Sequence, residues 1–288
     1  MKVTVLIDNI AHGECAGEWG LSFYIEHEGR QILLDGGATG KITENAERCG
    51  INLAEADFAV LSHAHYDHAD GLAAFLEVNR NALLYIRAGS KENCYGVDER
   101  GERYIGIAKD FLEKYKERIA YVSGDYELFP GVFLIPHKTE NLEELGKKGG
   151  LYIKSGTELV PDGFAHEQSL VFDTEKGLVI FNSCSHGGVE NIVYEVTETL
   201  PCRKVYAYLG GMHLFQTPDD EVKALAERFA KLGIERIITG HCTGRRPCRC
   251  CRAIRTFPWN RCIPAWKSYS ERPQLLCKAR QEDDEMLY

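Results

Sequence analysis

The chain has 288 residues and is 44% hydrophobic, which is enough to bury a core as one large domain or two small ones. Its formal net charge of −9 disfavours sequence-independent binding to nucleic acids. No apolar run approaches the roughly 20 residues of a membrane helix, and residues 1–9 are typical of a first strand rather than of a signal peptide. We therefore expect a cytoplasmic protein that acts on a small molecule, with neither nucleic acid nor a membrane as partner and with its oligomeric state left open.

Short strands alternate with helices along most of the chain. Apolar runs bounded by turn residues predict strands over residues 3–8, 21–27, 31–37, 57–63, 82–88, 132–136, 169–183 (a hairpin), 204–211 and 234–241. Helical periodicity and end signals predict helices over residues 39–49, after Asp67, and over 106–117, 188–200 and 219–233. Residues 136–166, rich in glycine and charge, are interpreted as an insertion near a site. This mixture of elements favours sheets packed face to face with helices outside.

The segment LSHAHYDHADG, at residues 61–71, carries the strongest chemical signal. It places His63, His65, Asp67 and His68 within six positions, at the end of a predicted buried strand. In an extended loop, residues i and i+2 point to the same side, so the first two histidines can bind one ion. The aspartate and the third histidine follow where the chain turns into a helix, and they can bind a second ion. The alternative, a set of surface histidines near a helix cap, is disfavoured by this clustering.

The HxHxDH pattern after a short hydrophobic strand resembles the signature of the metallo-β-lactamase superfamily. QILLDGG resembles the family's early strand, whose aspartate (here Asp35) supports the metal loop from behind, and ITGHCTG resembles the late strand whose histidine (here His241) completes the second metal site. The resemblance covers roughly residues 1–244. It implies one α/β domain over 1–244, the αββα four-layer sandwich of the superfamily.

Four further segments narrow the resemblance to a branch of that superfamily. FAHEQSLVF, FNSCSHGGVENI, LGGMHL and GHCTG together resemble the branch that is named after dihydropterin-ylmethyl ribofuranosylaminobenzene phosphate synthase. This resemblance implies action on a pterin or another phosphorylated small molecule.

The remaining metal ligands follow the family pattern with one departure. The family pattern has a third histidine just before a hairpin strand, and His166 stands there. It also has a bridging aspartate at the end of the next strand, and here this sequence departs from it, because Cys184 stands at that position. Three alternatives follow: a Cys184 thiolate replaces the carboxylate, His186 is a ligand, or hydroxide alone bridges the metals. Cys184 could also be an ordinary buried residue. His213 either contacts substrate, supports the site, or is a structural histidine.

The expected chemistry is hydrolysis with two divalent ions, zinc being favoured and iron or manganese being alternatives. A hydroxide held by both metals would attack a small, phosphorylated or pterin-like substrate, with Asp67, His65 and His186 as the catalytic residues. One alternative is a metal-dependent transferase or synthase in pterin cofactor metabolism. Another is a metal-containing binding protein without turnover, which the intact motif disfavours. Di-iron redox chemistry, β-lactamase activity and nuclease activity are less favoured readings.

Residues 245–288 depart from the rest of the chain, because arginine and cysteine crowd there without apolar periodicity. The chain has 11 cysteines, an odd number, and without a secretion signal we expect reduced thiols. The CxxC pair Cys248 and Cys251 could belong to a zinc module, but a matching second pair is lacking. A basic nucleic-acid arm is another alternative. We favour a tail that is not the family's native ending, either an altered reading frame or a divergent extension, with weak packing beyond about Gly244.

Overall fold

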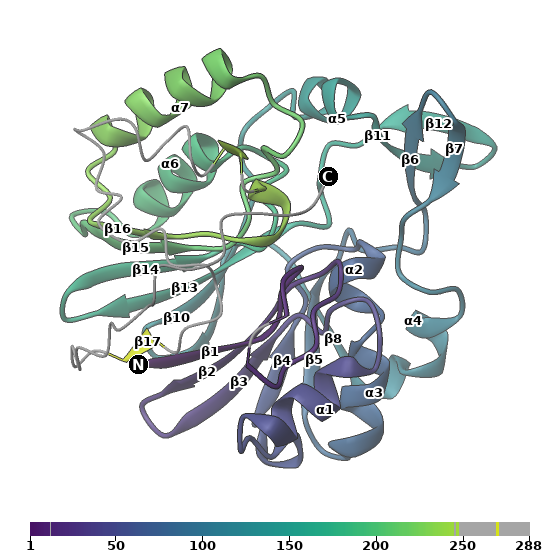
Figure 1. Cartoon of the computed structure of the whole chain (residues 1–288), viewed down its shortest axis with the longest axis vertical. Coiled ribbons are helices and arrows are strands. Elements are labelled where there is room, and N and C mark those ends of the chain that lie inside the picture. Colours follow the sequence, from purple (N-terminus) through teal and green to yellow (C-terminus); the bar gives the residue numbers. More distant parts are fainter. Residues whose placement is uncertain (12, 245, 248–268, 271–288) are drawn as a thin grey trace.

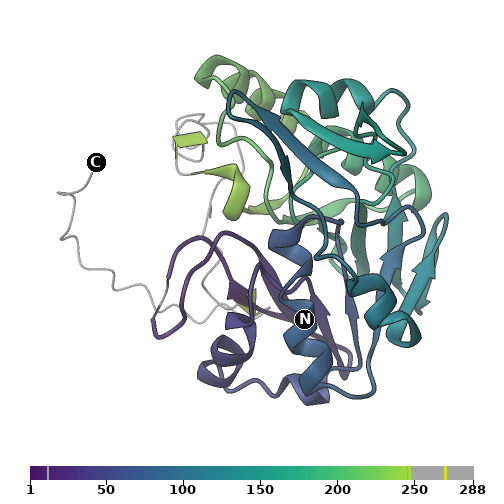
Figure 2. The ribbon, with the colours of Figure 1, turned by 90° about the vertical axis from the view of Figure 1, so that its right-hand side faces the viewer.

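Two β-sheets face each other at the centre of the molecule, and helices cover their outer faces (Figure 1). The computed structural model describes residues 1–11, 13–244, 246–247 and 269–270. The earlier part of the chain, purple to blue, forms one side of the molecule, and the later part, teal to green, forms the other (Figures 1 and 2). Among the described residues, no helix is long and apolar enough to cross a membrane.

The first sheet has seven strands in the order β17-β1-β2-β3-β4-β5-β8. Its strands are β1 (Lys2–Ile7), β2 (Ser22–His27), β3 (Arg30–Leu34), β4 (Phe58–Val60), β5 (Leu83–Arg87), β8 (Ile119–Val122) and β17 (Tyr269–Ser270). The helices on this side of the molecule are α1 (Lys41–Arg48), α2 (Tyr66–Ala69), α3 (Leu72–Val78) and α4 (Phe111–Lys114). Strands β3, β4, β5 and β8 are parallel, so their carboxyl ends reach one edge of the sheet.

The second sheet has six strands in the order β16-β15-β14-β13-β10-β9. Its strands are β9 (Tyr126–Phe129), β10 (Val132–Pro136), β13 (Gln168–Thr174), β14 (Gly177–Phe181), β15 (Val205–Leu209) and β16 (Arg236–Ile238). Helices α6 (Val189–Thr199) and α7 (Asp219–Lys231) cover it. The predicted hairpin of β13 and β14 is present and antiparallel, and β14, β15 and β16 are parallel.

Three apolar clusters hold the layers together. One lies between the first sheet and its helices, where Phe75 of α3 is fully buried. A second lies between the other sheet and α6 and α7, where Phe229 is buried. The third joins the two sheets, with Phe23 and Phe181 in edge-to-face contact at 5.6 Å. Because apolar residues fill all three interfaces, the chain forms the predicted αββα sandwich.

A third, smaller sheet was not predicted from the sequence. It has four strands in the order β12-β11-β6-β7, namely β6 (Cys94–Asp98), β7 (Gly101–Tyr104), β11 (Leu151–Ser155) and β12 (Glu158–Pro161). Helix α5 (Glu143–Gly149) precedes β11. The predicted insertion at residues 136–166 therefore has regular structure, and it pairs with a hairpin far away in the sequence. The predicted helix over 106–117 is shorter than expected and divides into α4 and a 3₁₀ turn at Lys116–Arg118.

The chain after Gly244 is described at two places. Arg246 donates to the carbonyl of Thr217 at 2.6 Å, and β17 pairs with Lys2 and Val3 of β1. The predictions for the rest of the tail, including the Cys248 and Cys251 pair, lie outside the described residues.

Candidate metal centre

Three imidazoles meet at the end of β4 and of β14. The donor nitrogens of His63, His65 and His186 lie within 4.8 Å of one another, and all three side chains are buried. Within the described chain, Nε2 of His63, Nε2 of His65 and both ring nitrogens of His186 have no hydrogen-bond partner. A buried polar atom without a partner costs about 1–3 kcal/mol. One nitrogen from each of these three rings around one point would suit a metal ion that satisfies them.

His166 lies beside this group but uses both of its ring nitrogens. Its Nδ1 accepts a hydrogen bond from the backbone N–H of Ala64 at 3.1 Å, and its Nε2 lies 2.9 Å from Asp162 Oδ2. Its ring centroid is 5.4 Å from that of His65, whereas the ring of His186 is 4.7 Å from His65. His166, Asp162, Cys94 and His65 also bring donor atoms within 4.8 Å of one another. In the described structure both ring nitrogens of His166 are thus engaged in hydrogen bonds, whereas those of His186 are not, and the prediction that His166 is a metal ligand stays a prediction.

A second group of donors lies directly beside the first. Nε2 of His68 and Nε2 of His241 are 3.2 Å apart, and Asp67 Oδ2 lies 3.7 Å and 3.3 Å from these two nitrogens. The rings of His63 and His68 are only 4.2 Å apart, so the two groups share a wall. One carboxylate oxygen and two imidazole nitrogens that converge on one point suit a second divalent ion.

The imidazoles of the second group are held from behind by polar side chains. Asp35 Oδ2 accepts from His68 Nδ1 at 2.8 Å, and Asn9 Oδ1 lies 2.9 Å from His241 Nδ1. In the first group, Ser62 Oγ lies 2.8 Å from His63 Nδ1. When Nδ1 of a histidine is engaged in this way, the Nε2 lone pair faces the metal position. Asp35 also accepts from the N–H and the hydroxyl of Ser62, both at 2.7 Å, so it fixes the start of the motif loop.

Two thiols complete the floor of the site. Cys184 Sγ lies 3.2 Å from His68 Nε2 and 3.4 Å from Cys242 Sγ. Both cysteines are buried, and Cys242 Sγ accepts from the backbone N–H of His213 at 3.2 Å. The structure thus places Cys184 beside the second group of donors, and the alternative that its thiolate replaces the bridging carboxylate stays a prediction. His213 lines the same pocket, with its ring 4.5 Å from that of His186.

The electrostatics of the site suit metal binding. Burial and neighbouring imidazoles lower the pKa of His63 and His186 well below its usual range, and they lower that of His65 to about 3. These imidazoles are therefore neutral at physiological pH, as metal ligands must be. Burial alone would raise the pKa of Asp67, but His68 and His241 lower it, so this side chain is an ionised carboxylate.

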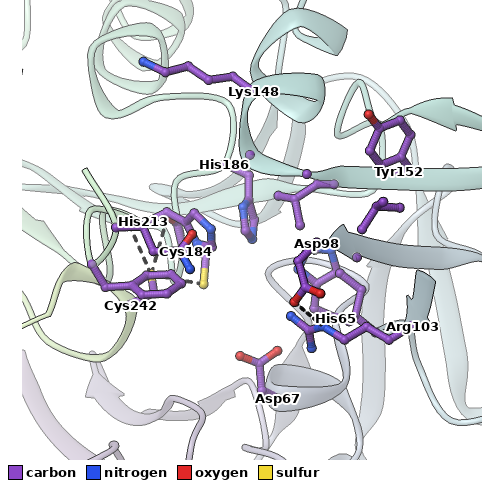
Figure 3. A pocket seen from close by; sticks show the side chains of 18 of the residues that line it. His65, Asp67, Asp98, Arg103, Lys148, Tyr152, Cys184, His186, His213 and Cys242 are labelled. Atoms are coloured by element: carbon purple, nitrogen blue, oxygen red, sulfur yellow. Dashed lines mark hydrogen bonds and ion pairs between the residues drawn. The ribbon is translucent and has the colours of Figure 1, made fainter. Parts of the chain in front are cut away.

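The site opens on a pocket of about 450 Å³ (Figure 3). Cys184, His213 and Cys242 line one side, and Asp98, Arg103 and Tyr152 of the small sheet line the other. Asp67 points into the pocket from below, and Lys148 lies at its upper rim (Figure 3). Figure 3 therefore shows imidazole, thiol and carboxylate groups around one pocket, together with acidic and basic side chains.

Sequence reasoning missed several residues that shape this site. Asp8 accepts from the backbone N–H of His241 at 2.9 Å, and the ring of Trp19 lies 5.1 Å from that of the same histidine at a tilt of 55°. Cys242 was not predicted either, although its position next to His241 was a usable signal. No local pattern marks Asp8, Asn9 or Trp19, because they reach the site from the other end of the chain.

Comparison with known proteins identifies the class of this fold and site. The family model described as the metallo-beta-lactamase superfamily matches residues 20–241. The chain therefore belongs to the metallo-β-lactamase superfamily, as its motif predicted. A solved structure, Tm1679, described as a metal-dependent hydrolase of the beta-lactamase superfamily, has a TM-score of 0.75 and 28% identity over 88% of this chain and 92% of its own.

Sequence relatives confirm the predicted branch. The 7,8-dihydropterin-6-methyl-4-(beta-D-ribofuranosyl)-aminobenzene-5'-phosphate synthase of Methanocaldococcus jannaschii is 32% identical over 242 residues, which cover 78% of this chain and 81% of that protein. The anti-Pycsar protein Apyc1 of Paenibacillus harenae is 28% identical over 182 residues, which cover 59% of this chain and 67% of that protein.

Proposed function

We propose that this protein is a metal-dependent hydrolase that holds two divalent metal ions and acts on a small phosphorylated substrate. The observation that carries the proposal is the pair of adjacent donor groups at the bottom of one pocket. His63, His65 and His186 would hold one ion. Asp67, His68 and His241 would hold the other, with the Cys184 thiolate within reach of it. Zinc suits this mixture of imidazole, carboxylate and thiol best, and iron or manganese would fit the imidazoles and the carboxylate.

Metal ions bound in such a site supply Lewis-acid polarisation and lower the pKa of bound water to about 7. The protein's own groups would do the rest. Asp67 is ionised and points into the pocket, so it can accept and pass on a proton during hydrolysis. Asp35, Ser62 and Asn9 hold the imidazoles in one orientation, which preorganises the site.

The mouth of the pocket supports a phosphorylated substrate. Arg103, Lys147 and Lys148 line it, although Arg103 lies 4.0 Å from Asp98 and Lys148 lies 2.8 Å from Glu221. Lys147 and Lys148 precede Gly149 and Gly150, whose backbone also lines the pocket. Cations at the rim of a cavity attract anionic substrates and raise their local concentration. The relative from Methanocaldococcus jannaschii, whose name includes a phosphate and a pterin, points to the same class of substrate.

A second candidate is a synthase or transferase in pterin cofactor metabolism. It is favoured by one specific observation, the 32% identity to the archaeal synthase over most of both chains. The same metal centre and pocket would serve this reaction, with a second substrate in place of water. Product analysis separates the two candidates, because hydrolysis releases the two halves of a substrate and the synthase reaction joins two substrates.

Metal content per chain tests the proposal. The protein is purified without oxygen and without added metal, and it is then reconstituted in parallel with zinc, iron or manganese. We expect about two ions per chain. His186→Ala and His241→Ala should each lose one ion, whereas His27→Ala, a control outside the site, should keep both. A His166→Ala protein that retains two ions would support His186 as the third imidazole.

The loaded protein is then screened with phosphorylated pterins and simple phosphoesters. Turnover that is lost in folded His65→Ala would support the hydrolase. A protein that binds no ion after reconstitution would overturn the proposal and leave the binding-protein alternative.

A further inference from the structure

The geometry points to a positioning role for three buried ionisable side chains, Glu167, His137 and Glu195. They are linked to one another by hydrogen bonds, and they hold the backbone of His186 in place for metal binding. This inference rests on the proposed function, because it concerns one of the three imidazoles that would hold the first ion. None of the three side chains lines the pocket, and none belongs to the HxHxDH segment. They come from different parts of the fold: His137 directly follows β10, Glu167 directly precedes β13, and Glu195 lies in α6.

Glu167 holds the backbone that carries His186. Its Oε1 accepts from the N–H of His186 at 3.0 Å, and its Oε2 accepts from the N–H of Gly187 at 2.9 Å. The Glu167 side chain has no solvent exposure. Two hydrogen bonds from adjacent N–H groups to one carboxylate fix both the place and the orientation of that peptide unit.

His137 links Glu167 to a second carboxylate. Its Nε2 lies 2.5 Å from Glu167 Oε2, and its Nδ1 lies 3.0 Å from Glu195 Oε2. Each ring nitrogen faces a carboxylate oxygen, so both must carry a hydrogen and the ring is an imidazolium. Glu195 is anchored in turn, because its Oε1 accepts from the N–H of Lys138 and of Thr139 at 2.8 and 2.9 Å. These three side chains therefore connect the turn at His186 to helix α6 through charge-assisted hydrogen bonds.

The packing around this turn leaves little freedom. A Cβ atom on Gly187 would lie 2.2 Å from Cε1 of His137, so only glycine fits against the imidazole. Ser185 has a left-handed backbone with φ of 58°, and its N–H is held by Asn182 Oδ1 at 2.8 Å. A strained backbone persists only where surrounding contacts over-determine it. The turn is thus held before His186 by Asn182 and at and after it by Glu167.

No side chain orients the ring of His186, unlike the rings of His63, His68 and His241. His63, His68 and His241 are each oriented through Nδ1 by a neighbouring side chain. Among the described residues, neither ring nitrogen of His186 has such a partner. Its ring has only a stacking contact with Phe164, at 5.3 Å, and edge contacts with other histidines. The hydrogen bonds from the main chain to Glu167 therefore take the place of the side-chain hydrogen bond that positions the rings of His63, His68 and His241.

The test is zinc affinity of the full chain, measured by competition with a chromophoric chelator. In Glu167→Gln, the side-chain NH₂ group cannot accept the second N–H and faces the His137 ring. We expect the affinity of one of the two sites to fall about 10–100-fold, the range seen for groups that orient metal ligands. The same site should be the one lost in His186→Ala, and the other site should keep its affinity.

Two further variants keep the result interpretable. His137→Gln removes the link but leaves Glu167 in place, and it should weaken the same site less; it decides the question if Glu167→Gln does not fold. Asn79→Ala is the stability control, because its buried amide donates to the carbonyls of Leu53 and Ala56, far from the site. It should lower the unfolding temperature without changing zinc affinity.

Unchanged zinc affinity in folded Glu167→Gln, or in folded His137→Gln when the former does not fold, would overturn the positioning role while the two-metal function stands. The positioning role would also be overturned if Glu167→Gln and Asn79→Ala lowered the zinc affinity of both sites equally, because that result would show a general loss of stability. Absence of any zinc site that depends on His186 in the wild-type protein would instead overturn the proposed function.

Discussion

Replacing Asp35 by asparagine should disable the second metal site without unfolding the protein. The Asp35 carboxylate is fully buried and accepts three hydrogen bonds, from the Ser62 N–H, the Ser62 hydroxyl and His68 Nδ1, at 2.7, 2.7 and 2.8 Å. Its backbone is left-handed, with φ of 62°, a conformation that asparagine tolerates better than most residues. The substitution therefore changes the chemistry of the side chain with little change in backbone strain.

The main effect comes through the His68 tautomer. An asparagine amide can still accept from the Ser62 N–H, but its NH₂ group then faces His68 Nδ1. The imidazole can meet that donor only by moving its proton to Nε2, the nitrogen that lies 3.2 Å from His241 Nε2. Nε2 then has no lone pair for a metal. We expect a loss of about 10–100-fold in metal affinity, which corresponds to about 1.4–2.7 kcal/mol. The metal-free protein should lose about 1–3 kcal/mol of folding stability, the cost of an imperfectly satisfied buried group.

Zinc competition and urea unfolding of the metal-free protein measure these two effects separately. Asp57→Asn is the matched control, because Asp57 also accepts from a backbone N–H, that of Gln31 at 2.7 Å, but lies outside the site. It should leave zinc affinity unchanged. If folded Asp35→Asn bound two zinc ions as tightly as the wild type, the argument that Asp35 sets the orientation of His68 would be refuted.

Three other changes test the surroundings of the site. In Gly71→Ala, a Cβ atom would lie 2.0 Å from a backbone oxygen, so urea unfolding should show that the free energy of unfolding falls by about 1–3 kcal/mol. Gly40→Ala is the control, because its Cβ atom would have only one neighbouring atom, at 3.7 Å, and the change should be close to neutral. Burial alone would lower the pKa of His137, but its two carboxylate partners raise it from 6.5 to about 9. The contribution of this group to the free energy of unfolding of the metal-free protein should therefore be complete below pH 6.5 and decline as the pH rises to 9. A flat profile of unfolding free energy against pH would contradict this. Treating the metal-free protein with a disulfide oxidant should join Cys184 and Cys242, whose sulfurs are 3.4 Å apart, by loss of two protons and two electrons to the reagent. Peptide mass spectrometry should find this link and should find it suppressed by bound zinc; a link that forms equally with zinc present would argue against thiols beside the metal.

The sequence predicted the layers of the fold well because their signals are local. Apolar runs mark strands such as Leu83–Arg87, and the spacing of Val222, Ala226 and Phe229 marks the buried face of α7. The small sheet could not be predicted in the same way. Its strands are short and polar, and Leu151 of β11 pairs with Gly96 of β6, which lies on a different hairpin. Such pairing depends on tertiary contacts that no local pattern records.

The family pattern predicted His166 as the third histidine of the first group and offered His186 only as a ligand in place of the missing bridging aspartate. His166 lies just before β13 and His186 in the loop after β14, so position in the chain allows both to face the site. The difference lies in their partners. Asp162, four residues before His166, takes its Nε2, whereas nothing in the described structure takes the nitrogens of His186. Side-chain direction and hydrogen bonding, which a one-dimensional pattern does not contain, separate the two.

Asp8 and Asn9 form hydrogen bonds with His241, although they precede it in the sequence by 233 and 232 positions. During synthesis, the loop with His63 and His65 leaves the ribosome long before His241 exists, and contacts between distant residues form late because closing a long loop costs entropy. The group of Asp67, His68 and His241 is therefore completed only late in folding, when the first strand meets the loop after β16. A metal ion bound by this group would stabilise the contact between these two distant parts of the described domain.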